Sequence, residues 1–366
     1  MTALRQRHLL NLLGIEVPII QAPMAGATTP EMVVAVCEAG GLGSLPSAQY
    51  AEAELKAALD RIRAGTQRPF NVNFFCHANP AEDPDRQASW LARLSPYFVE
   101  AGLDPGMPLT PSGRRPFDAV ACAVVEAYRA AVVSFHFGLP ESRLLDRVRM
   151  TGAKVLSSAT TVDAALWLAE HGCDAIIAQG YEAGGHRGLF LSDDISTQAG
   201  TMALVPQVVD AVHVPVIAAG GIADGRGVVA AFALGAAAVQ VGTAFLFCPE
   251  AKISPMHREA LRAAKDNGTV LTNVFTGRPA RGLVNRVVRE VGPLSDAAPA
   301  FPLAATAMSP LRTAAEASGS GDFSPLWSGQ AAALGRDRSA GELTRWIADD
   351  AQAQLGHLSG SGRANG

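Results

Sequence analysis

Val214-Pro-Val-Ile-Ala-Ala-Gly-Gly-Ile222 joins a run of small and branched apolar residues to a glycine turn. Continuous apolar character over this length indicates a strand that is buried on both faces, as the strands of a covered parallel sheet are. Asp224 follows the turn and precedes the apolar stretch 228–234, where its carboxylate can cap the first turn of a helix. This segment therefore predicts one unit of strand, turn and helix.

Similar units occupy most of the first 245 residues, where short runs rich in Val, Ile and Ala return at intervals of roughly 20 to 35 residues. Thr161 stands before a helical stretch in the same way as Asp224 does. Eight strands are expected, at 17–21, 41–44, 70–74, 132–135, 154–157, 175–178, 214–218 and 238–241. Such an alternation predicts an α/β protein with the (β/α)8 fold of a TIM barrel.

Two regions of the 366-residue chain interrupt this repeat. The first is an insertion after the third strand, at about 77–116, which is rich in proline and too long for an ordinary loop. The second is a C-terminal extension, 246–357, with a helix expected at 342–354. Because barrels build their active sites where the strand-to-helix loops gather, we expect a barrel at 1–245 whose mouth both regions cover. The Gly/Ser-rich tail 358–366 is expected to be disordered.

The composition is that of a globular enzyme, because 48% hydrophobic and 17% charged residues allow a large core. The formal net charge is −4 and no run of Lys or Arg occurs, so nucleic-acid binding is not expected. The five cysteines are scattered and form no C-x-x-C pair, which indicates neither a disulfide framework nor a metal site. A reducing cytoplasm is the simplest setting for such cysteines.

Neither export nor membrane association is expected. The N-terminal residues lack the basic, apolar and small-residue succession of a signal peptide. The stretch 228–248 is apolar enough to imitate a membrane span. However, Gly235, Gln240 and Gly242 divide it into a helix and a strand.

Glycine turns follow the last two expected strands, Gly220-Gly221 after the seventh and Gly242-Thr243 after the eighth. Barrels commonly bind phosphate with backbone N–H groups in these two loops, and glycine lets the backbone approach an anion closely. One glycine pair by itself indicates only a tight turn, whereas two at the expected places favour a phosphate site. The phosphate could belong to a nucleotide, a sugar phosphate or a flavin.

The ends of other strands favour a flavin. Ala22-Pro23-Met24, after the first strand, offers a rigid backbone and a soft side chain that could lie along a flat ring. Asn73 and Gln179 offer amides for the edges of such a ring, although either amide alone could be structural. These features suit the isoalloxazine of FMN, and the sequence has neither a dinucleotide fingerprint nor a P-loop.

Glu182-Ala-Gly-Gly-His-Arg-Gly188 follows the sixth strand and places His186 among glycines, with Gly184 and Gly185 directly before it. So much backbone freedom costs stability, so function explains the loop better. A histidine that titrates near neutrality can take a proton or hold an anionic substrate beside a flavin. His186 is therefore the predicted catalytic residue. His136, at the end of the fourth strand, is a second candidate, with a packing role as its alternative.

Together these motifs resemble the nitronate monooxygenases, formerly called 2-nitropropane dioxygenases, and in particular their class I. The resemblance extends over nearly the whole chain and is carried by residues 21–24, 69–75, 133–140, 178–188, 218–222 and 275–282. It implies an FMN-dependent barrel that oxidises alkyl nitronates, the anions of nitroalkanes, with O2 to carbonyl compounds and nitrite. In the implied mechanism the nitronate passes one electron to FMN and a flavin semiquinone forms.

The resemblance also implies roles for individual residues. His186 matches the family's catalytic histidine, which in some members also deprotonates the neutral nitroalkane. The residues implied to contact FMN are Ala22, Pro23, Met24, Asn73, Gln179, Gly184, Gly185, Gly220, Gly221, Gly242, Thr243 and, in the late motif Trp327-Ser-Gly-Gln, Gln330. Since the chain has only four tyrosines, Phe74, Phe75 and Phe137 are expected to line the substrate pocket instead.

Three other functions stay open at this point. An FMN-dependent enoyl-ACP reductase or quinone reductase that uses NAD(P)H would share the barrel and a related glycine-histidine loop. A catalytically silent flavin-binding protein would keep the barrel without its chemistry, but the intact loop around His186 argues against it. A sugar-phosphate lyase on the same fold would bind no flavin and would be colourless.

Overall fold

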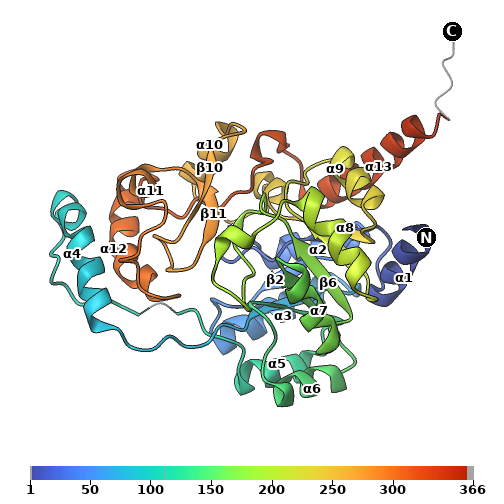
Figure 1. Cartoon of the computed structure of the whole chain (residues 1–366), viewed down its shortest axis with the longest axis horizontal. Helices are drawn as coiled ribbons and strands as arrows, with labels where there is room; N and C mark the ends of the chain where they lie inside the picture. The colour runs from blue at the N-terminus through green and yellow to red at the C-terminus, as the bar shows by residue number, and fades with distance from the viewer. Residues whose placement is uncertain (1, 112, 361–366) are drawn as a thin grey trace, which may run out of the picture.

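A parallel barrel dominates the computed structural model, which describes residues 2–111 and 113–360 (Figure 1). Its strands are β1 (Ile19–Gln21), β2 (Ser44–Pro46), β3 (Asn71–Phe75), β4 (Val132–His136), β5 (Lys154–Ala159), β6 (Ala175–Gln179), β8 (Val216–Ala219) and β9 (Ala238–Val241). They pair in the order β1-β9-β8-β6-β5-β4-β3-β2. A parallel bridge between Ile20 and Leu42 joins the two ends of this sheet and closes the barrel. The predicted (β/α)8 fold is confirmed, and each of the eight predicted strands overlaps an observed one, although the second, predicted at 41–44, is found at 44–46.

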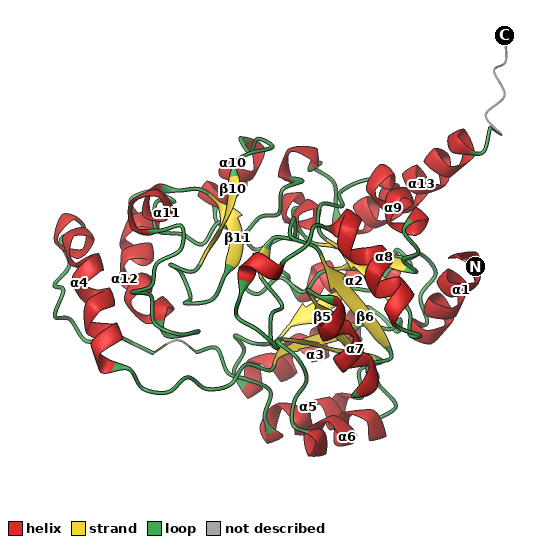
Figure 2. Ribbon diagram, in the orientation of Figure 1, coloured by secondary structure: helices red, strands yellow, loops and turns green. Residues whose placement is uncertain are grey.

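Helices surround the strands, as Figure 2 shows. Those between the barrel strands are α2 (Pro30–Glu38), α3 (Glu52–Gly65), α5 (Ala119–Tyr128), α6 (Ser142–Met150), α7 (Val162–Glu170), α8 (Thr201–Ala211) and α9 (Gly225–Ala233). The predicted caps are present, because the Thr161 side chain accepts from the N–H of Ala164 and Asp224 accepts from that of Arg226. Most strands lead into a helix that starts at the barrel mouth, whereas β3 is followed by the insertion, β6 by the loop that carries His186, and β9 by the extension.

Apolar side chains from alternating strand positions fill one end of the barrel. Ile20, Leu156 and Ile217 form one buried cluster with Leu9 and Leu13 of α1 (Thr2–Leu13). The N-terminal helix therefore closes the end of the barrel opposite the mouth, and this packing leaves the mouth as the open end.

The last helix of the chain completes the ring around the barrel. α13 (Ala340–Leu358) contains the helix expected at 342–354 and packs against α9, α2 and β1. It thus takes the place of the eighth barrel helix, whereas the whole extension, this helix included, was expected to cover the mouth. Ser359 and Gly360 form a turn after α13, and the remainder of the expected disordered tail lies outside the described residues.

The insertion and the extension build a second small core beside the barrel, seen at the left of Figure 1. α4 (Pro84–Glu100), from the insertion, packs Trp90, Leu94 and Phe98 against α11 (Arg286–Val291) and α12 (Ala304–Ala317) of the extension. The remaining elements of the extension are α10 (Pro255–Arg262), β10 (Thr269–Thr272), β11 (Ala280–Leu283) and η3 (Ala332–Leu334), while η1 (Ile195–Thr197) precedes α8 and η2 (Thr243–Phe247) follows β9. We call the α4, α11 and α12 assembly the side lobe.

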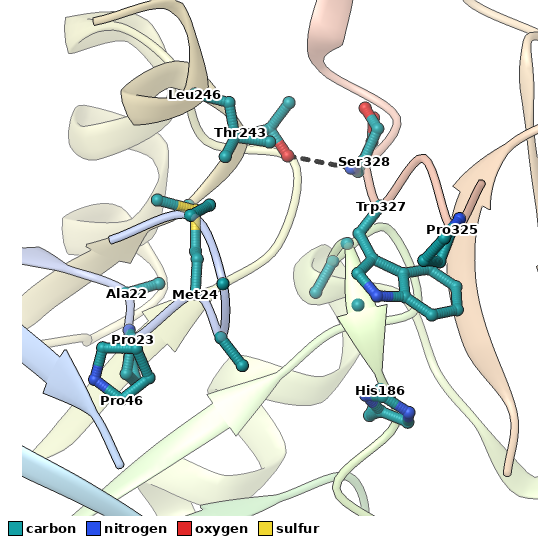
Figure 3. A pocket seen from close by; sticks show the side chains of 18 of the residues that line it. Ala22, Pro23, Met24, Pro46, His186, Thr243, Leu246, Pro325, Trp327 and Ser328 are labelled. Atoms are coloured by element: carbon teal, nitrogen blue, oxygen red, sulfur yellow. Dashed lines mark hydrogen bonds between the residues drawn. The ribbon is translucent and has the colours of Figure 1, made fainter. Parts of the chain in front are cut away.

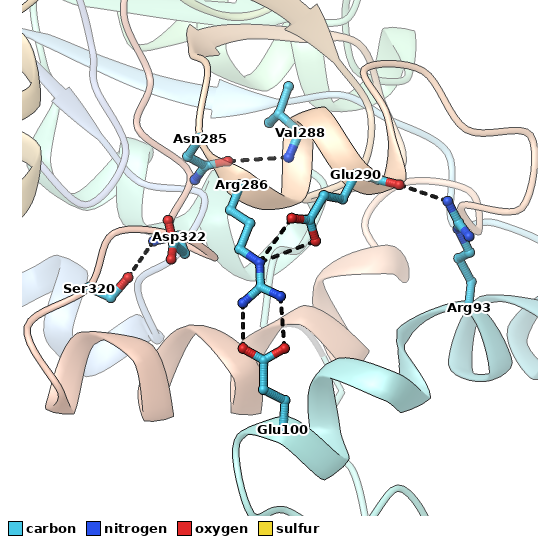
Figure 4. A network of polar contacts seen from close by, with 8 residues as sticks. All are labelled: Arg93, Glu100, Asn285, Arg286, Val288, Glu290, Ser320 and Asp322. Carbon is cyan, nitrogen blue, oxygen red and sulfur yellow. Dashed lines mark hydrogen bonds and ion pairs between the residues drawn. The ribbon is translucent and has the colours of Figure 1, made fainter.

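Polar contacts also join the two parts of the side lobe (Figure 4). The guanidinium of Arg286 donates to both carboxylate oxygens of Glu100, at 2.5 and 2.8 Å, and to Glu290 at 3.1 Å. Arg93 donates to the backbone carbonyl of Glu290 at 2.7 Å. α4 and α11 are therefore held together by ionic contacts at the surface as well as by the apolar core.

The apolar stretch 228–248 is divided as expected, since it contains most of α9, all of β9 and all of η2. Within residues 2–111 and 113–360, no helix has both the length and the apolar character required to cross a membrane.

Candidate functional site

A cavity of about 290 Å³ opens at the mouth of the barrel, between the strand ends and the C-terminal extension. Most of the predicted site residues lie on its wall. These are Ala22, Pro23, Met24, Asn73, His136, Gln179, Gly184, Gly185, His186, Gly220, Gly221, Gly242 and Thr243. The fold therefore brings together side chains and glycine turns from six of the eight barrel strands.

Gln330 is placed differently from the others. Its side chain is exposed, and the neighbouring residues Gly329 and Ala331 contribute to the cavity wall. The backbone N–H of Gln330 donates to the carbonyl of Glu182 at 3.0 Å, and the N–H of Gly329 donates to Oγ1 of Thr243 at 2.8 Å. The late motif thus reaches the cavity through its backbone.

The loop around His186 is part of a second sheet, which the sequence did not predict. β7 (Gly185–His186) pairs with β11 (Ala280–Leu283), which in turn pairs with β10 (Thr269–Thr272). Gly184 lies so close to the late motif that a Cβ atom there would come within 2.5 Å of the backbone nitrogen of Gly329. The extension therefore fixes the backbone that carries the candidate catalytic histidine.

The carbonyl oxygen of His186 accepts two hydrogen bonds from inside the barrel. Nε2 of His136 lies 3.1 Å from it and Nε2 of Gln179 lies 3.0 Å from it. Oε1 of Gln179 in turn accepts from the N–H of Gly188 at 2.8 Å. The amide of Gln179 is therefore engaged in shaping the loop on which His186 stands.

The imidazole of His186 has one occupied and one free nitrogen. Nε2 lies 2.9 Å from Oγ1 of Thr276, in the loop between β10 and β11, whereas Nδ1 has no hydrogen-bond partner in the described part of the chain. Burial and the positive charges of Arg114 and Arg278 hold the pKa of His186 well below its ordinary value. At neutral pH this imidazole is therefore uncharged and able to accept a proton.

His136 has partners at both ring nitrogens, because Nδ1 lies 3.0 Å from Oγ of Ser158 and Nε2 lies beside the His186 carbonyl. Since a carbonyl can only accept, Nε2 carries the proton and Nδ1 accepts from Ser158. Burial lowers the pKa of His136 to about 3. The ring is thus neutral and fully hydrogen-bonded, which fits the positioning alternative considered for it.

The glycine turn after β8 has a backbone that favours glycine, and its N–H groups have no partners among the described residues. Gly220 and Gly221 have φ angles of 120° and 70°, which side-chain-bearing residues rarely adopt. A Cβ on Gly220 would come within 2.8 Å of Oγ1 of Thr201. No hydrogen bond from the N–H of Gly220 or Gly221 occurs within the described residues, so both donors are available to a ligand.

Several residues that line the cavity were not predicted from the sequence. Gln240 lines the cavity, and its buried Oε1 has no partner among the described residues. A polar side chain inside the apolar strand β9 was the signal that could have identified it. Trp327 lies 5.4 Å from His186 between ring centroids. Figure 3 shows both rings across the cavity from Met24. Arg114, from the insertion, also lines the cavity and had no signal in its local sequence.

Arg187 and Tyr181, which flank the His186 loop, are not cavity residues. Arg187 is fully buried and donates to the carbonyls of Gln179 and Gly180 at 2.9 and 2.8 Å, which ties the loop to β6. Tyr181 is at the surface beneath the guanidinium of Arg281.

Three phenylalanines were expected in the pocket. Phe75 lines the cavity and Phe137 packs against Phe75. Phe74 lies in the apolar core against Phe117 and Phe135.

The chain is similar to known proteins over nearly its whole length. The sequence model of the nitronate monooxygenase family matches residues 6–350. The chain is 43% identical to a nitronate monooxygenase of Pseudomonas aeruginosa over 346 residues, which cover 93% of this chain and 97% of the relative. It is 40% identical to a nitronate monooxygenase of Paraburkholderia phytofirmans, with 96% and 97% of the two chains covered.

Solved structures give the same result. The crystal structure of nitroalkane oxidase from Streptomyces ansochromogenes superposes with a TM-score of 0.87 at 38% identity, over 96% of this chain and 99% of the other. The enoyl reductase domain of MlnA from Bacillus amyloliquefaciens, at 12% identity and a TM-score of 0.64, shares the fold alone. The chain therefore belongs to the nitronate monooxygenase family and is an oxidoreductase.

Proposed function

We propose that this protein binds FMN and oxidises alkyl nitronates with O2 to carbonyl compounds and nitrite. The observation that carries the proposal is His186, whose neutral imidazole presents an unpartnered Nδ1 at the wall of a cavity that also contains a glycine anion turn. A proton acceptor beside a phosphate site suits a flavin enzyme that acts on nitroalkanes and on their anions.

The residues of the cavity fit FMN. The free N–H groups of Gly220 and Gly221, with those at Gly242 and Thr243, would hold the phosphate. The flat ring would be held between the loop of Ala22, Pro23 and Met24 and the side of the cavity that carries His186. The unpartnered Oε1 of Gln240 is a buried acceptor that such a ligand would satisfy.

When bound, FMN supplies the one-electron chemistry that links the nitronate to O2. The protein's own contribution is to place the substrate and to handle its proton. With a neutral nitroalkane, Nδ1 of His186 takes the proton from the carbon that bears the nitro group. With a nitronate, which has already lost this proton, the ring of His186 only orients the anion. Thr276 and the two donors to the His186 carbonyl keep the ring in place for either role.

The absorption spectrum of the purified protein gives the first test, since bound FMN makes the protein yellow and a colourless protein would contradict the proposal. The second test is nitrite release from propane-2-nitronate under air. Anaerobic reduction of the flavin by NADH or NADPH at the turnover rate, without nitrite release from the nitronate, would favour the NAD(P)H-dependent reductase instead.

A His186→Ala variant tests the histidine. Its expected effect is retention of FMN with a loss of about 100-fold or more in turnover of the neutral nitroalkane, as removal of a general base produces. The loss with the preformed nitronate should be much smaller. His213→Ala, which changes an exposed histidine, is the matched control. Equal activity of His186→Ala and wild type on both substrates would refute the assigned role.

A further inference from the structure

Arg114 stands out among the residues of the cavity wall, because its charge has no partner among the described residues. The side chain is partly buried, and the loss of solvent around it lowers the pKa of its guanidinium to about 10. No hydrogen bond or ion pair to this guanidinium occurs in the described part of the chain. Removing a cation from water costs free energy unless a negative group binds to it.

The carboxylates on the cavity wall already have partners. Among the described lining residues these are Glu182 and Glu316. Glu182 accepts from the N–H and the hydroxyl of Thr201, each at 2.8 Å. Glu316 accepts from Arg312 at 2.8 Å and from Ser324 at 2.7 Å. Neither acid therefore neutralises Arg114, and the positive charge of this arginine is not balanced on the cavity wall.

Arg114 lies in the same cavity as His186, the candidate proton acceptor. Arg114 and His186 both lie on the wall of this cavity, and the positive charge of Arg114 contributes to the lowered pKa of His186. The glycine turn after β8, where a phosphate would bind, lies beside Glu182 and Thr201. The unmatched charge therefore shares the cavity with the proton acceptor.

Other unpaired donors gather in the same neighbourhood. The His77 side chain is only 5% exposed, and neither of its ring nitrogens has a partner among the described residues. Its ring lies 4.8 Å from that of Phe301, which in turn lies 5.3 Å from His186. The guanidinium of Arg278 lies 4.1 Å over the Phe137 ring, and its Nε is also unpaired. Neither side chain lines the cavity, but the positive charge of Arg278 acts on His186 and adds to the positive potential of Arg114, which favours an anionic occupant.

We propose that Arg114 is the substrate-binding group for the negative charge of the nitronate, and that it contacts the nitro oxygens while His186 faces the carbon beside them. This proposal rests on the proposed function and adds to it a residue from the insertion. A nitronate bears its negative charge largely on the two oxygens, whereas a neutral nitroalkane bears none. Arg114 therefore makes the site selective for the anion over its conjugate acid.

The test uses the FMN-loaded full-length protein and three variants, Arg114→Gln, Arg114→Lys and Arg115→Gln. Arg115 is the exposed neighbour and serves as the matched control. For Arg114→Gln we expect KM for propane-2-nitronate to rise by about 10-fold or more, as loss of a charge-assisted hydrogen bond produces. Its KM for neutral 2-nitropropane should change little, and Arg114→Lys should recover most of the nitronate affinity.

A binding measurement without turnover completes the test. Nitrate is a planar oxyanion with the shape of a nitro group, and its Kd can be read from the change it causes in the flavin absorption. This Kd should rise in Arg114→Gln in parallel with the nitronate KM and stay unchanged in Arg115→Gln. Flavin content and melting temperature are recorded for every variant.

The outcomes separate the two proposals. If wild type releases nitrite but Arg114→Gln retains both its nitronate KM and its nitrate Kd, the role of Arg114 is overturned and the proposed function stands. If Arg114→Gln instead loses FMN, the arginine serves the cofactor and the role is again overturned. If wild type releases no nitrite, the proposed function fails, and the nitrate titration alone supports or overturns the anion site.

Discussion

Nε2 of His186 lies 2.9 Å from Oγ1 of Thr276, so a hydroxyl from the C-terminal extension fixes the ring of a histidine that follows a barrel strand. The Thr276 hydroxyl also lies 3.4 Å from the carbonyl of Arg278, to which it can donate. In this arrangement the threonine oxygen accepts from Nε2–H of His186, and the lone pair is left on Nδ1. The extension thus selects the tautomer that can act as a base.

Replacement of Thr276 by valine, which has the same shape but no hydroxyl, should weaken this selection. We expect kcat for a neutral nitroalkane to fall by about 10-fold, because Nε2 loses its acceptor and the ring its orientation. Turnover of the preformed nitronate should fall less, since no proton has to be removed. The Thr276→Ser variant keeps the hydroxyl and should stay near wild type. An equal loss on both substrates would show that the threonine only supports the loop.

The pH dependence of activity follows from the lowered pKa of His186. Because the folded protein keeps this imidazole neutral below the ordinary value of 6.5, the base form persists as the pH falls through that value. For a freshly dissolved neutral nitroalkane, we therefore expect kcat/KM to fall with decreasing pH only below pH 6.5. The measurement is an initial-rate profile in buffers of constant ionic strength. An acid limb centred at or above 6.5 would contradict the electrostatic picture of the site.

The strands and the glycine turns could be predicted from sequence because both depend on local patterns. A buried parallel strand requires an apolar run, and Gly220-Gly221 with its positive φ angles requires glycine, so each leaves a signal within a few residues. The position of α13 could not be predicted in the same way. Its amphipathic pattern reveals a helix, but its packing on α2 and α9 depends on contacts between distant parts of the chain.

The same distinction applies to the site. His186 and most of the cofactor candidates stand directly after barrel strands, where the fold itself assigns them a place. Arg114, Thr276 and Trp327 belong to the insertion and the extension, whose path across the mouth no local pattern determines. The pairing of β7 with β11 was missed for this reason too, because two residues next to glycines carry no strand periodicity.

His77 provides a test of acid stability, with the sign fixed by its lowered pKa. Burial lowers the pKa of His77 to about 4, while the unfolded chain keeps the ordinary value of 6.5. Between these values the unfolded state binds more protons, so the free energy of unfolding falls as the pH falls, by up to about 3 kcal/mol in total. A phenylalanine side chain does not titrate, so the His77→Phe variant should flatten this dependence.

Urea unfolding of wild type and His77→Phe at pH 7 and pH 5 measures this effect. The variant should be at least as stable as wild type at pH 7, because phenylalanine suits the neighbouring rings of Phe137 and Phe301 and leaves no buried nitrogen unpaired. Its advantage should grow at pH 5. A variant that loses stability as steeply as wild type would show that other groups dominate the acid response.

The side lobe should depend on its apolar core far more than on its surface ion pairs. Trp90 is fully buried and its Nε1 donates to the carbonyl of Ala304 at 3.3 Å, so Trp90→Ala should cost about 3–5 kcal/mol of lobe stability. Glu100, which pairs with Arg286, has a side chain that is 57% exposed, and Glu100→Gln should change the melting temperature little. Hydrogen exchange of α4 measures the stability of the lobe in both variants, with faster exchange expected only for Trp90→Ala.

Because the insertion that carries α4 also carries Arg114, the nitronate KM should rise in Trp90→Ala and stay constant in Glu100→Gln. An unchanged KM in a Trp90→Ala protein whose α4 exchanges freely would mean that the barrel alone positions Arg114.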